Sequence, residues 1–450
     1  MAIGKIYDEG FETDLEREAV DDALGEVESG NEYDKSILFD VLKWSDYSEL
    51  NAIMNQLADE IIDVPGNKQE KYKRHLKVIL CNLYAAYTIS PKYYVAISLN
   101  KNNYAPGSRY NALKIAYEPT SHIVHKIKNV DLIQFKIGFH DDQGSSRVSR
   151  MRAAGKLLEA FAACKDTIIA RHPNRETIIL KNIDKTLKKY RDTEDTFRYR
   201  DNLVKINAAI ASASITLDMP DDEFRQLNQG SLKKRNIPID LNMSQLYRVF
   251  NNGSFTQGGR FYGGWWQLVP EEQRKHILID GEPTVELDYK ALHPTLLYLE
   301  QAGHLPDDDP YVLEGHQGDK FMREVGKSML LIAINAKDSS QGLRATRRHL
   351  EGKFGKDEGR IHGLDLGDVI EQYKMKHKLI SWYFYTGYGT KLQFKDSWLA
   401  ERIMLRLIKA GIVCLGVHDS FIVKQRHRHE LFQAMEVVFE AKYHALPGID

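Results

Sequence analysis

The sequence predicts an α+β protein in which a mostly helical N-terminal region precedes an antiparallel sheet packed by helices. Three observations favour this class. Apolar residues recur at helical spacing in several segments, of which Gln69–Thr88 is the clearest. Short runs rich in β-branched and aromatic residues, such as Tyr93–Leu99, are typical of strands. In the C-terminal half, the apolar runs Val285–Tyr289 and Gly416–Val423 each carry one aspartate at an end or a turn.

The composition is that of a globular chain. Its 450 residues, 42% hydrophobic and 28% charged, suffice for two or three domains with their own cores. A net charge of −1 gives no overall basic field, although a large enzyme can confine positive charge to a cleft. Cys81, Cys164 and Cys414 lie in apolar contexts without metal-type spacing, which predicts buried free thiols and a cytoplasmic location. No apolar run is long enough to span a bilayer, so no membrane partner is expected.

The N-terminal region divides into two parts. Residues 1–35 are acidic, lack the basic start and apolar core of a signal peptide, and are expected to form a flexible N-terminus. Residues 36–165 are expected to form an α/β module. Its predicted elements are a helix over Ser36–Glu60, the helix and strand named above, a strand over Leu132–Phe139, and a helix from about Val148 that carries Arg150 and Arg152.

The order helix, strand, polar turn and basic residues in this module resembles the wing of a winged-helix nucleic-acid-binding domain. An ordinary surface hairpin explains the same pattern. The sequence leaves both interpretations open.

Residues 166–235 are expected to form a helical, basic connecting region. Basic and aromatic residues alternate in Lys181–Arg200, a pattern that suits a surface following a nucleic-acid strand but equally suits a solvated helix face. Ile206–Leu217 is apolar and Ala-rich, which predicts a core helix. The polar stretch Gln229–Asn236 predicts a link, and therefore a boundary before a domain that covers 236–450.

Two carboxylates dominate the chemistry of this last domain. Asp288 is expected at the end of a strand that turns into a helix, with the backbone carbonyl of Tyr289 beside it and Pro294 in the first helical turn. Asp419 is expected at the tip of an apolar hairpin. Carboxylates presented by neighbouring strands are suited to hold a pair of Mg²⁺ ions, or Mn²⁺ instead, against a triphosphate.

Cations accompany the carboxylates. Asp319–Ile334 predicts an amphipathic helix on which Arg323 and Lys327, four residues apart, share a face that leads to Asn335. Such a stripe suits a triphosphate and a sugar, although a surface helix with scattered charge explains it as well. Arg260, directly after two glycines, can form a fork with a phosphate.

The order of these parts resembles the family A DNA polymerases and the related single-subunit, phage-type RNA polymerases. The resemblance covers about the last half of the chain. It implies a right-hand palm, an antiparallel sheet with packed helices, with short fingers in 236–450 and a thumb-like role for 166–235. The matching positions are Gly259-Arg260, Gln267, Pro270, Leu287-Asp288-Tyr289, Arg323, Lys327, Asn335 and His418-Asp419-Ser420.

The resemblance also implies roles for single residues. Asp288 and Asp419 would be catalytic and, with the Tyr289 carbonyl, would hold the metal. The nucleotide would be bound by Arg323, Lys327, His293 and Asn335. A DNA or RNA primer–template would be contacted by Arg260, Gln267, His418 and Ser420. The expected activity is addition of nucleoside triphosphates to a 3′-hydroxyl with release of pyrophosphate.

Departures from the family pattern are informative. Asn335 stands where the family usually has a tyrosine, and His293 stands where its DNA-synthesising members have the glutamate that excludes a ribose 2′-hydroxyl. Only about 130 residues separate Asp288 from Asp419, which predicts reduced fingers. The N-terminal half shows no clear proofreading cluster.

Two other functions fit the sequence. One is a non-catalytic, replication-initiator-like nucleic-acid-binding protein with a degenerate palm. The other is a metal-dependent nuclease, although Ser420 occupies a position where a third carboxylate would serve that chemistry. The choice between DNA and RNA product, the need for a template or primer, and the oligomeric state stay open.

Overall fold

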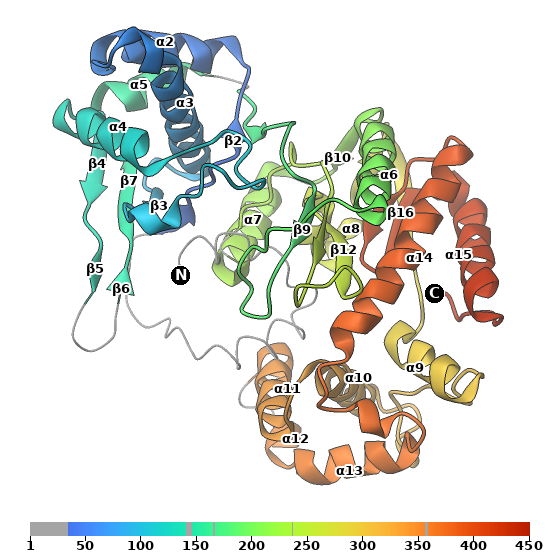
Figure 1. The fold of residues 1–450 in the computed structure, drawn as a ribbon. Coiled ribbons are helices and arrows are strands. Elements are labelled where there is room, and N and C mark those ends of the chain that lie inside the picture. Colours follow the sequence, from blue (N-terminus) through green and yellow to red (C-terminus); the bar gives the residue numbers. More distant parts are fainter. Residues whose placement is uncertain (1–34, 141–145, 165–166, 236, 356–358) are drawn as a thin grey trace.

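The computed structural model describes residues 35–140, 146–164, 167–235, 237–355 and 359–450 (Figure 1). The expected flexible segment 1–35 therefore lies almost wholly outside the described residues. Helices and several small sheets combine in one chain, as the α+β prediction requires. Figure 1 shows the N-terminal module in blue and cyan at one end, and a group of helices in orange that forms a separate lobe.

The N-terminal module has its own hydrophobic core, built from residues between Ile37 and Ile169 and joined by Leu232. Four strands form its sheet in the order β1-β3-β7-β4, with β1 and β3 parallel and the other pairs antiparallel. The elements are β1 Ser36–Leu38, β2 Lys43–Trp44, α2 Ser48–Ile61, α3 Gly66–Ile89, β3 Tyr94–Ile97, η1 Lys101–Asn103, α4 Tyr117–Asn129, β4 Ile133–Lys136, β5 Phe139–His140, β6 Ser146–Arg147, β7 Ser149–Ala153 and α5 Gly155–Ala163.

Two predicted helices of this module are corrected by the structure. The segment from Val148 is strand β7, because it pairs with both β3 and β4 and buries Met151 between them. Arg150 and Arg152 therefore lie on a strand. The predicted helix over Ser36–Glu60 is strand at its start and becomes helix only at α2, since β1 completes the sheet beside β3. The predicted hairpin does form, from β4 and β7 continued by β5 and β6.

The connecting region packs into the second hydrophobic core. It comprises β8 Ala170–Arg171, β9 Ile178–Leu180, α6 Glu194–Ala211, β10 Ile215–Leu217 and α7 Asp221–Arg235. Residues of β9 and α6 share one core with the C-terminal half, so the predicted boundary near Gln229 does not coincide with a break between cores. The predicted polar link there is part of helix α7. The predicted helix over Ile206–Leu217 ends at Ala211, and its last residues form β10, which pairs with β13 Ile277–Ile279.

The central sheet of the C-terminal half is antiparallel and has the order β10-β13-β14-β16-β15. A second sheet has the order β12-β11-β9. The remaining strands are β11 Tyr247–Phe250, β12 Gly258–Tyr262, β14 Glu282–Asp288, β15 Leu415–Val417 and β16 Ser420–Lys424. The helices are η2 Trp265–Leu268, α8 Glu271–Arg274, α9 Leu292–Ala302, α10 Lys320–Asn335, α11 Ser339–Phe354, α12 Gly359–His362, α13 Leu366–Lys376, η3 Ser381–Tyr383, α14 Gly389–Lys409, η4 Gln425–His427 and α15 Arg428–Tyr443.

Helix α14 connects the parts of this half. It contacts α10 in the helical lobe, β12 of the second sheet, and α15, which itself packs on β14 and β16 (Figure 1). Gly411, at φ +73°, follows its end, as the sequence predicts for a helix stop. Pro294 lies in the first turn of α9, also as predicted, because that position needs no backbone N–H.

The glycines before Arg260 bring β12 close to its neighbours within this same chain. Gly259 has φ +86°, and a Cβ there would lie 2.7 Å from Cε1 of Phe250 and 3.1 Å from Oγ of Ser397 on α14. Gly259 therefore allows close packing between β12 and α14.

We expect the Gly259→Ala variant to lower the free energy of unfolding by about 2–4 kcal/mol, because the added methyl group combines a left-handed backbone with a steric overlap. Urea denaturation would measure the change. Gly352→Ala is the matched control: its Cβ meets no atom within 4 Å inside helix α11, and it should stabilise by roughly 0.5–1 kcal/mol. Equal stabilities for the two variants would contradict this account.

The three cysteines are free and buried, as predicted. Within the part of the chain that the structure describes, every helix is too short or too polar to span a lipid bilayer.

Candidate active site

The structure brings Asp288 and Asp419 together at the ends of neighbouring strands of the central sheet. Asp288, the last residue of β14, lies directly opposite Ser420, the first residue of β16. Asp419 precedes Ser420 in the two-residue turn between β15 and β16, where His418 has φ +59°. The register of two adjacent antiparallel strands therefore places both carboxylates at the same end of the sheet.

The two carboxylates influence each other's protonation. Burial in the cleft raises the pKa of Asp288 well above its usual range, and the negative charges of Asp419 and Glu286 raise it further. Lys327 acts in the opposite direction and lowers the pKa of Asp288. Burial also raises the pKa of Asp419, although the nearby Arg260 lowers it. The walls of the cleft desolvate Asp288, yet the residue keeps solvent-accessible surface, so a cation from solvent can reach the pair.

Tyr289 presents only its backbone to the site. Its ring is buried, and its hydroxyl donates a hydrogen bond to the carbonyl of Met435 in α15 at 2.7 Å. The nearby backbone N–H of Tyr289 lowers the pKa of Asp288. Tyr289 and Ile449 form an isolated antiparallel bridge. The hydrogen bonds of this bridge are made by backbone groups of the neighbouring residues, so the carbonyl of Tyr289 takes no part in them.

This set of oxygen donors fits Mg²⁺ or Mn²⁺. The described residues contain no cluster of three or more histidine, cysteine or acidic side chains placed to bind a metal. Mg²⁺ is commonly held by one or two carboxylates and completes its shell with water and substrate phosphates, so a cluster of three is not required. A bound cation would also stabilise the charged forms of these two carboxylates, whose pKa values are raised by burial and, for Asp288, by the charge of Asp419.

A large cleft surrounds the carboxylate pair. Its volume is about 1480 Å³, and its walls come from β14, the β15–β16 turn, the start of α9 and one face of α10. Ten of the eleven site residues predicted from the sequence line it: Arg260, Gln267, Asp288, Tyr289, His293, Arg323, Lys327, His418, Asp419 and Ser420.

Helix α10 carries the two predicted cations into this cleft. Asp319 caps the helix by accepting hydrogen bonds from the N–H groups of Phe321 and Met322, and so fixes where its first turn begins. Arg323 is half exposed and pairs with Asp309 at 2.7 Å. Lys327 is exposed to the cleft and has no salt bridge to any residue that the structure describes.

Asn335 does not join this set. Its side-chain nitrogen donates to the carbonyl of Leu331 at 2.8 Å within α10. Its side-chain oxygen occupies the place where a Cβ on Gly389 would lie, at the start of α14. Asn335 thus ends α10 and packs it onto α14, away from the residues that line the cleft.

A buried charge cluster that the sequence did not indicate lies behind Asp419. Arg260 is 3% exposed, and its Nε and Nη2 donate to Asp396 of α14 at 2.9 and 2.5 Å. His293 Nε2 lies 3.0 Å from the same carboxylate, and His293 Nδ1 is buried without a hydrogen-bond partner among the described residues. Burial alone would raise the pKa of Asp396, but Arg260 and His293 hold it below its usual value. Asp396 is therefore an anion that positions both residues.

The other predicted primer or template contacts also have internal partners. Gln267 Nε2 donates to the carbonyls of Phe261 at 2.9 Å and Gly416 at 3.1 Å. The Ser420 hydroxyl donates to Glu286 at 2.5 Å. The ring of His418 meets that of Tyr262 edge-on at 5.7 Å. The predicted contacts of Arg260, Gln267, His418 and Ser420 with a nucleic acid stay predictions, and the structure adds a role in holding the site together.

Three residues of the site were missed at the level of sequence. Glu286 precedes Asp288 by two residues and so shares its face of β14, a position that strand alternation predicts. It is paired with Arg274 at 2.7 and 2.8 Å. Asp396 and Tyr311 gave no signal, because only tertiary packing brings them to the site. Burial raises the pKa of Tyr311 above its usual range, and Asp419 and Asp288 raise it further.

Comparisons with known proteins assign no family. Neither the protein-family models nor the curated proteins give a match to this chain. The geometry of the cleft is therefore the basis for a function.

Proposed function

We propose that this protein is a nucleotidyltransferase that synthesises DNA or RNA, adding nucleotides to a 3′-hydroxyl and releasing pyrophosphate. One observation carries the proposal. Asp288 and Asp419 meet at the end of adjacent antiparallel strands, in a cleft that is also lined by Arg323 and Lys327 from one helix. Paired carboxylates facing cations are what a metal-bound triphosphate requires.

The residues of the cleft would have different roles, according to the chemistry of their side chains. Asp288, Asp419 and the Tyr289 carbonyl would hold the divalent cations, which when bound supply Lewis-acid activation of the hydroxyl and neutralise phosphate charge. Lys327 has no salt bridge to any described residue, so its ammonium group is available to the triphosphate. Arg323 would exchange Asp309 for a phosphate. The Asp396–His293–Arg260 cluster would hold the wall next to the sugar in one position.

The finer architecture is part of the same proposal. The sheet β10-β13-β14-β16-β15 with α14 and α15 would be a palm, and α10–α13 would be short fingers. The β4–β7 hairpin of the N-terminal module would act as a wing that grips nucleic acid, in a protein of the cytoplasm.

Primer extension tests the proposal directly. The purified protein is incubated with Mg²⁺, a labelled primer–template, and either deoxynucleoside or nucleoside triphosphates, with template or primer omitted in parallel reactions. Extension that requires Mg²⁺ is expected in at least one arm, and the arm identifies the sugar and the need for a template. Degradation of the labelled strand without added nucleotides would instead indicate a nuclease, and binding without extension would indicate a non-catalytic binding protein.

We expect Lys327→Ala to raise the nucleotide KM and lower kcat/KM by roughly ten- to a hundredfold, because a charge-assisted contact to phosphate is lost. Steady-state titration of the nucleotide measures this change. Lys320→Ala is the matched control, since Lys320 is exposed on the first turn of the same helix and does not line the cleft. An identical titration for Lys327→Ala and Lys320→Ala would remove Lys327 from the site.

A further inference from the structure

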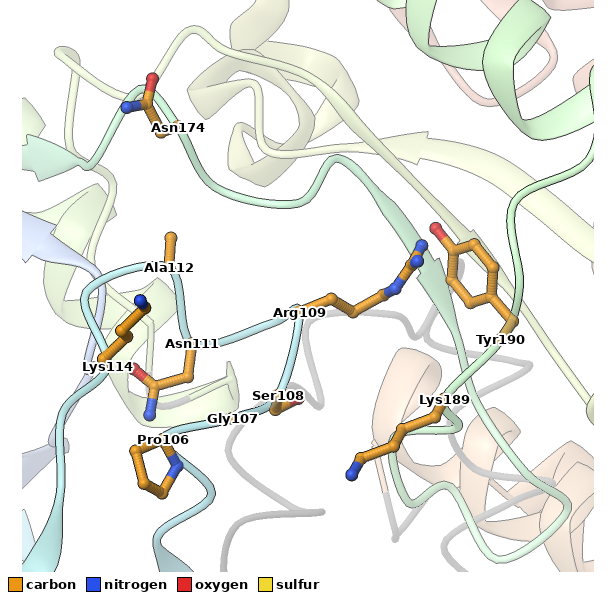
Figure 2. A pocket seen from close by; sticks show the side chains of 10 residues that line it. All are labelled: Pro106, Gly107, Ser108, Arg109, Asn111, Ala112, Lys114, Asn174, Lys189 and Tyr190. Carbon is orange, nitrogen blue, oxygen red and sulfur yellow. The ribbon is translucent and has the colours of Figure 1, made fainter.

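A second cavity, of about 510 Å³, lies where the N-terminal module meets the rest of the chain. One wall is the loop that follows β3 and η1, and the other is formed by the segments before and after β9. Figure 2 shows its ten lining residues: Pro106, Gly107, Ser108, Arg109, Asn111, Ala112, Lys114, Asn174, Lys189 and Tyr190. Three of these residues are cationic and none is acidic.

The two walls are tied together by buried polar contacts. The Tyr110 hydroxyl donates to the carbonyl of Lys188 at 2.8 Å and accepts from the N–H of Leu180 at 3.0 Å. Arg109 crosses the same junction to Asp192 at 3.1 Å and Glu176 at 3.2 Å. The cavity is therefore a fixed feature of the junction between the two cores.

The charged groups behind the cavity neutralise one another in ion pairs, whereas the lysines at its opening have no such partners among the described residues. Arg109 and Arg200 share the two carboxylates of Glu176 and Asp192, so these four groups neutralise one another. Lys114 and Lys189, one on each wall, are exposed and have no salt bridge to any described residue (Figure 2). Two ammonium groups without a salt bridge to a described residue thus line this cavity, one from each wall.

The lining favours a phosphate over a base. Tyr190 is the single aromatic residue among the ten, and the Arg109 guanidinium lies over its ring at 3.7 Å while Phe255 packs against it edge-on. A base would have to displace that guanidinium in order to stack. The Ser108 hydroxyl and the Asn174 amide add neutral hydrogen-bonding groups beside the two ammonium groups, a combination that phosphodiester contacts use.

We propose that this cavity binds a backbone phosphate of a polynucleotide strand, held between Lys114 and Lys189. The inference extends the proposed function, since it places a strand contact on the junction and outside the catalytic cleft. It also bears on the two interpretations of Lys181–Arg200, which were a surface that follows a nucleic-acid strand and a solvated helix face. Tyr199 is core and Arg200 is neutralised in the ion-pair cluster, whereas Lys189 faces the opening.

Salt-dependent binding tests the proposal. The full chain is titrated into a fluorescent single-stranded oligonucleotide, with anisotropy read over a series of salt concentrations. We expect Lys114→Ala/Lys189→Ala to weaken binding roughly tenfold at low salt and to reduce the slope of log K against log salt by about 1–2, because two phosphate contacts are lost. Lys114→Arg/Lys189→Arg should keep both values near wild type. Lys156→Ala/Lys409→Ala, which removes two exposed lysines elsewhere, is the matched control.

The outcomes separate this site from the catalytic proposal. Equal slopes for the alanine pair, its control and the wild type would overturn the phosphate site, as would an absence of polynucleotide binding by the wild type. A loss confined to free nucleoside triphosphate binding would overturn it too, since the cavity would then hold a mononucleotide. If the slope falls as expected but no variant or wild type extends a primer, the phosphate site stands and the polymerase proposal fails.

Discussion

Replacing Asp288 or Asp419 by alanine is expected to reduce Mg²⁺-dependent nucleotide incorporation by roughly 10³-fold or more, because either change removes one of the two carboxylates that we propose to hold the metal. Binding of a primer–template should change little, since neutralising an acid in the cleft removes no cation. Single-turnover extension and anisotropy binding would be measured on the same preparations. Wild-type turnover by either variant would end the proposed function.

The stability of Asp288→Asn provides an independent control. The folded state raises the pKa of Asp288, so it binds the proton more tightly than the unfolded chain does, and ionisation of the group costs stability as the pH rises above about 3.9. At neutral pH without divalent ions, this variant should therefore have a higher Tm than the wild type. The difference should vanish below about pH 4. A lower Tm at neutral pH would show that the lost activity reflects misfolding.

Replacing Asp396 by asparagine is expected to lower the free energy of unfolding by about 3–5 kcal/mol, because it leaves the Arg260 guanidinium buried without its counterion. The pKa of Asp396 is held below its usual value, so its contribution is present above the unfolded pKa and is lost as the pH falls through the folded one. The deficit of the variant should accordingly be largest at neutral pH and shrink in acid. Chemical denaturation across this pH range would measure it.

Two double variants distinguish the effect of the buried charges from the effect of side-chain packing. Arg260→Met/Asp396→Leu removes both charges and should recover most of the lost stability, since an apolar pair of similar size replaces a buried ion pair at little cost. Arg248 and Glu401 form a comparable buried pair between β11 and α14, outside the cleft. Arg248→Met/Glu401→Leu should preserve the nucleotide KM, whereas Arg260→Met/Asp396→Leu should raise it. The same KM for both double variants would assign the Asp396 cluster to stability alone.

The sequence predicted which residues line the cleft better than it predicted the surrounding fold. Asp288, Asp419 and the Arg323–Lys327 pair were predictable, because each lies in a short segment whose periodicity shows where its strand or helix runs and ends. Strand β7 was mistaken for a helix, since its basic residues alternate with apolar ones over too few positions to show a period. The predicted boundary near Gln229 does not separate two cores, because apolar residues of β9 and α6 lie in the same core as the C-terminal half.

Tertiary partners of the site were beyond prediction. Asp396 lies in a helix whose pattern shows only an apolar face, and nothing in that pattern indicates an arginine on a distant strand. Asn335 illustrates the converse. A motif position indicated a ligand contact, whereas the structure uses the residue to pack two helices together.

That helix contact bears on how substrate enters. No space for even one methyl group separates the end of α10 from Gly389, and α14 in turn is paired with β12 through Arg260 and with β11 through Arg248. Helix α10, which carries Arg323 and Lys327, is therefore tied to the sheet that carries the two carboxylates through α14 and the contact of α14 with β15. We expect the nucleotide to enter a receptor already shaped for it, with the rate of encounter, rather than closure of a lid, limiting capture.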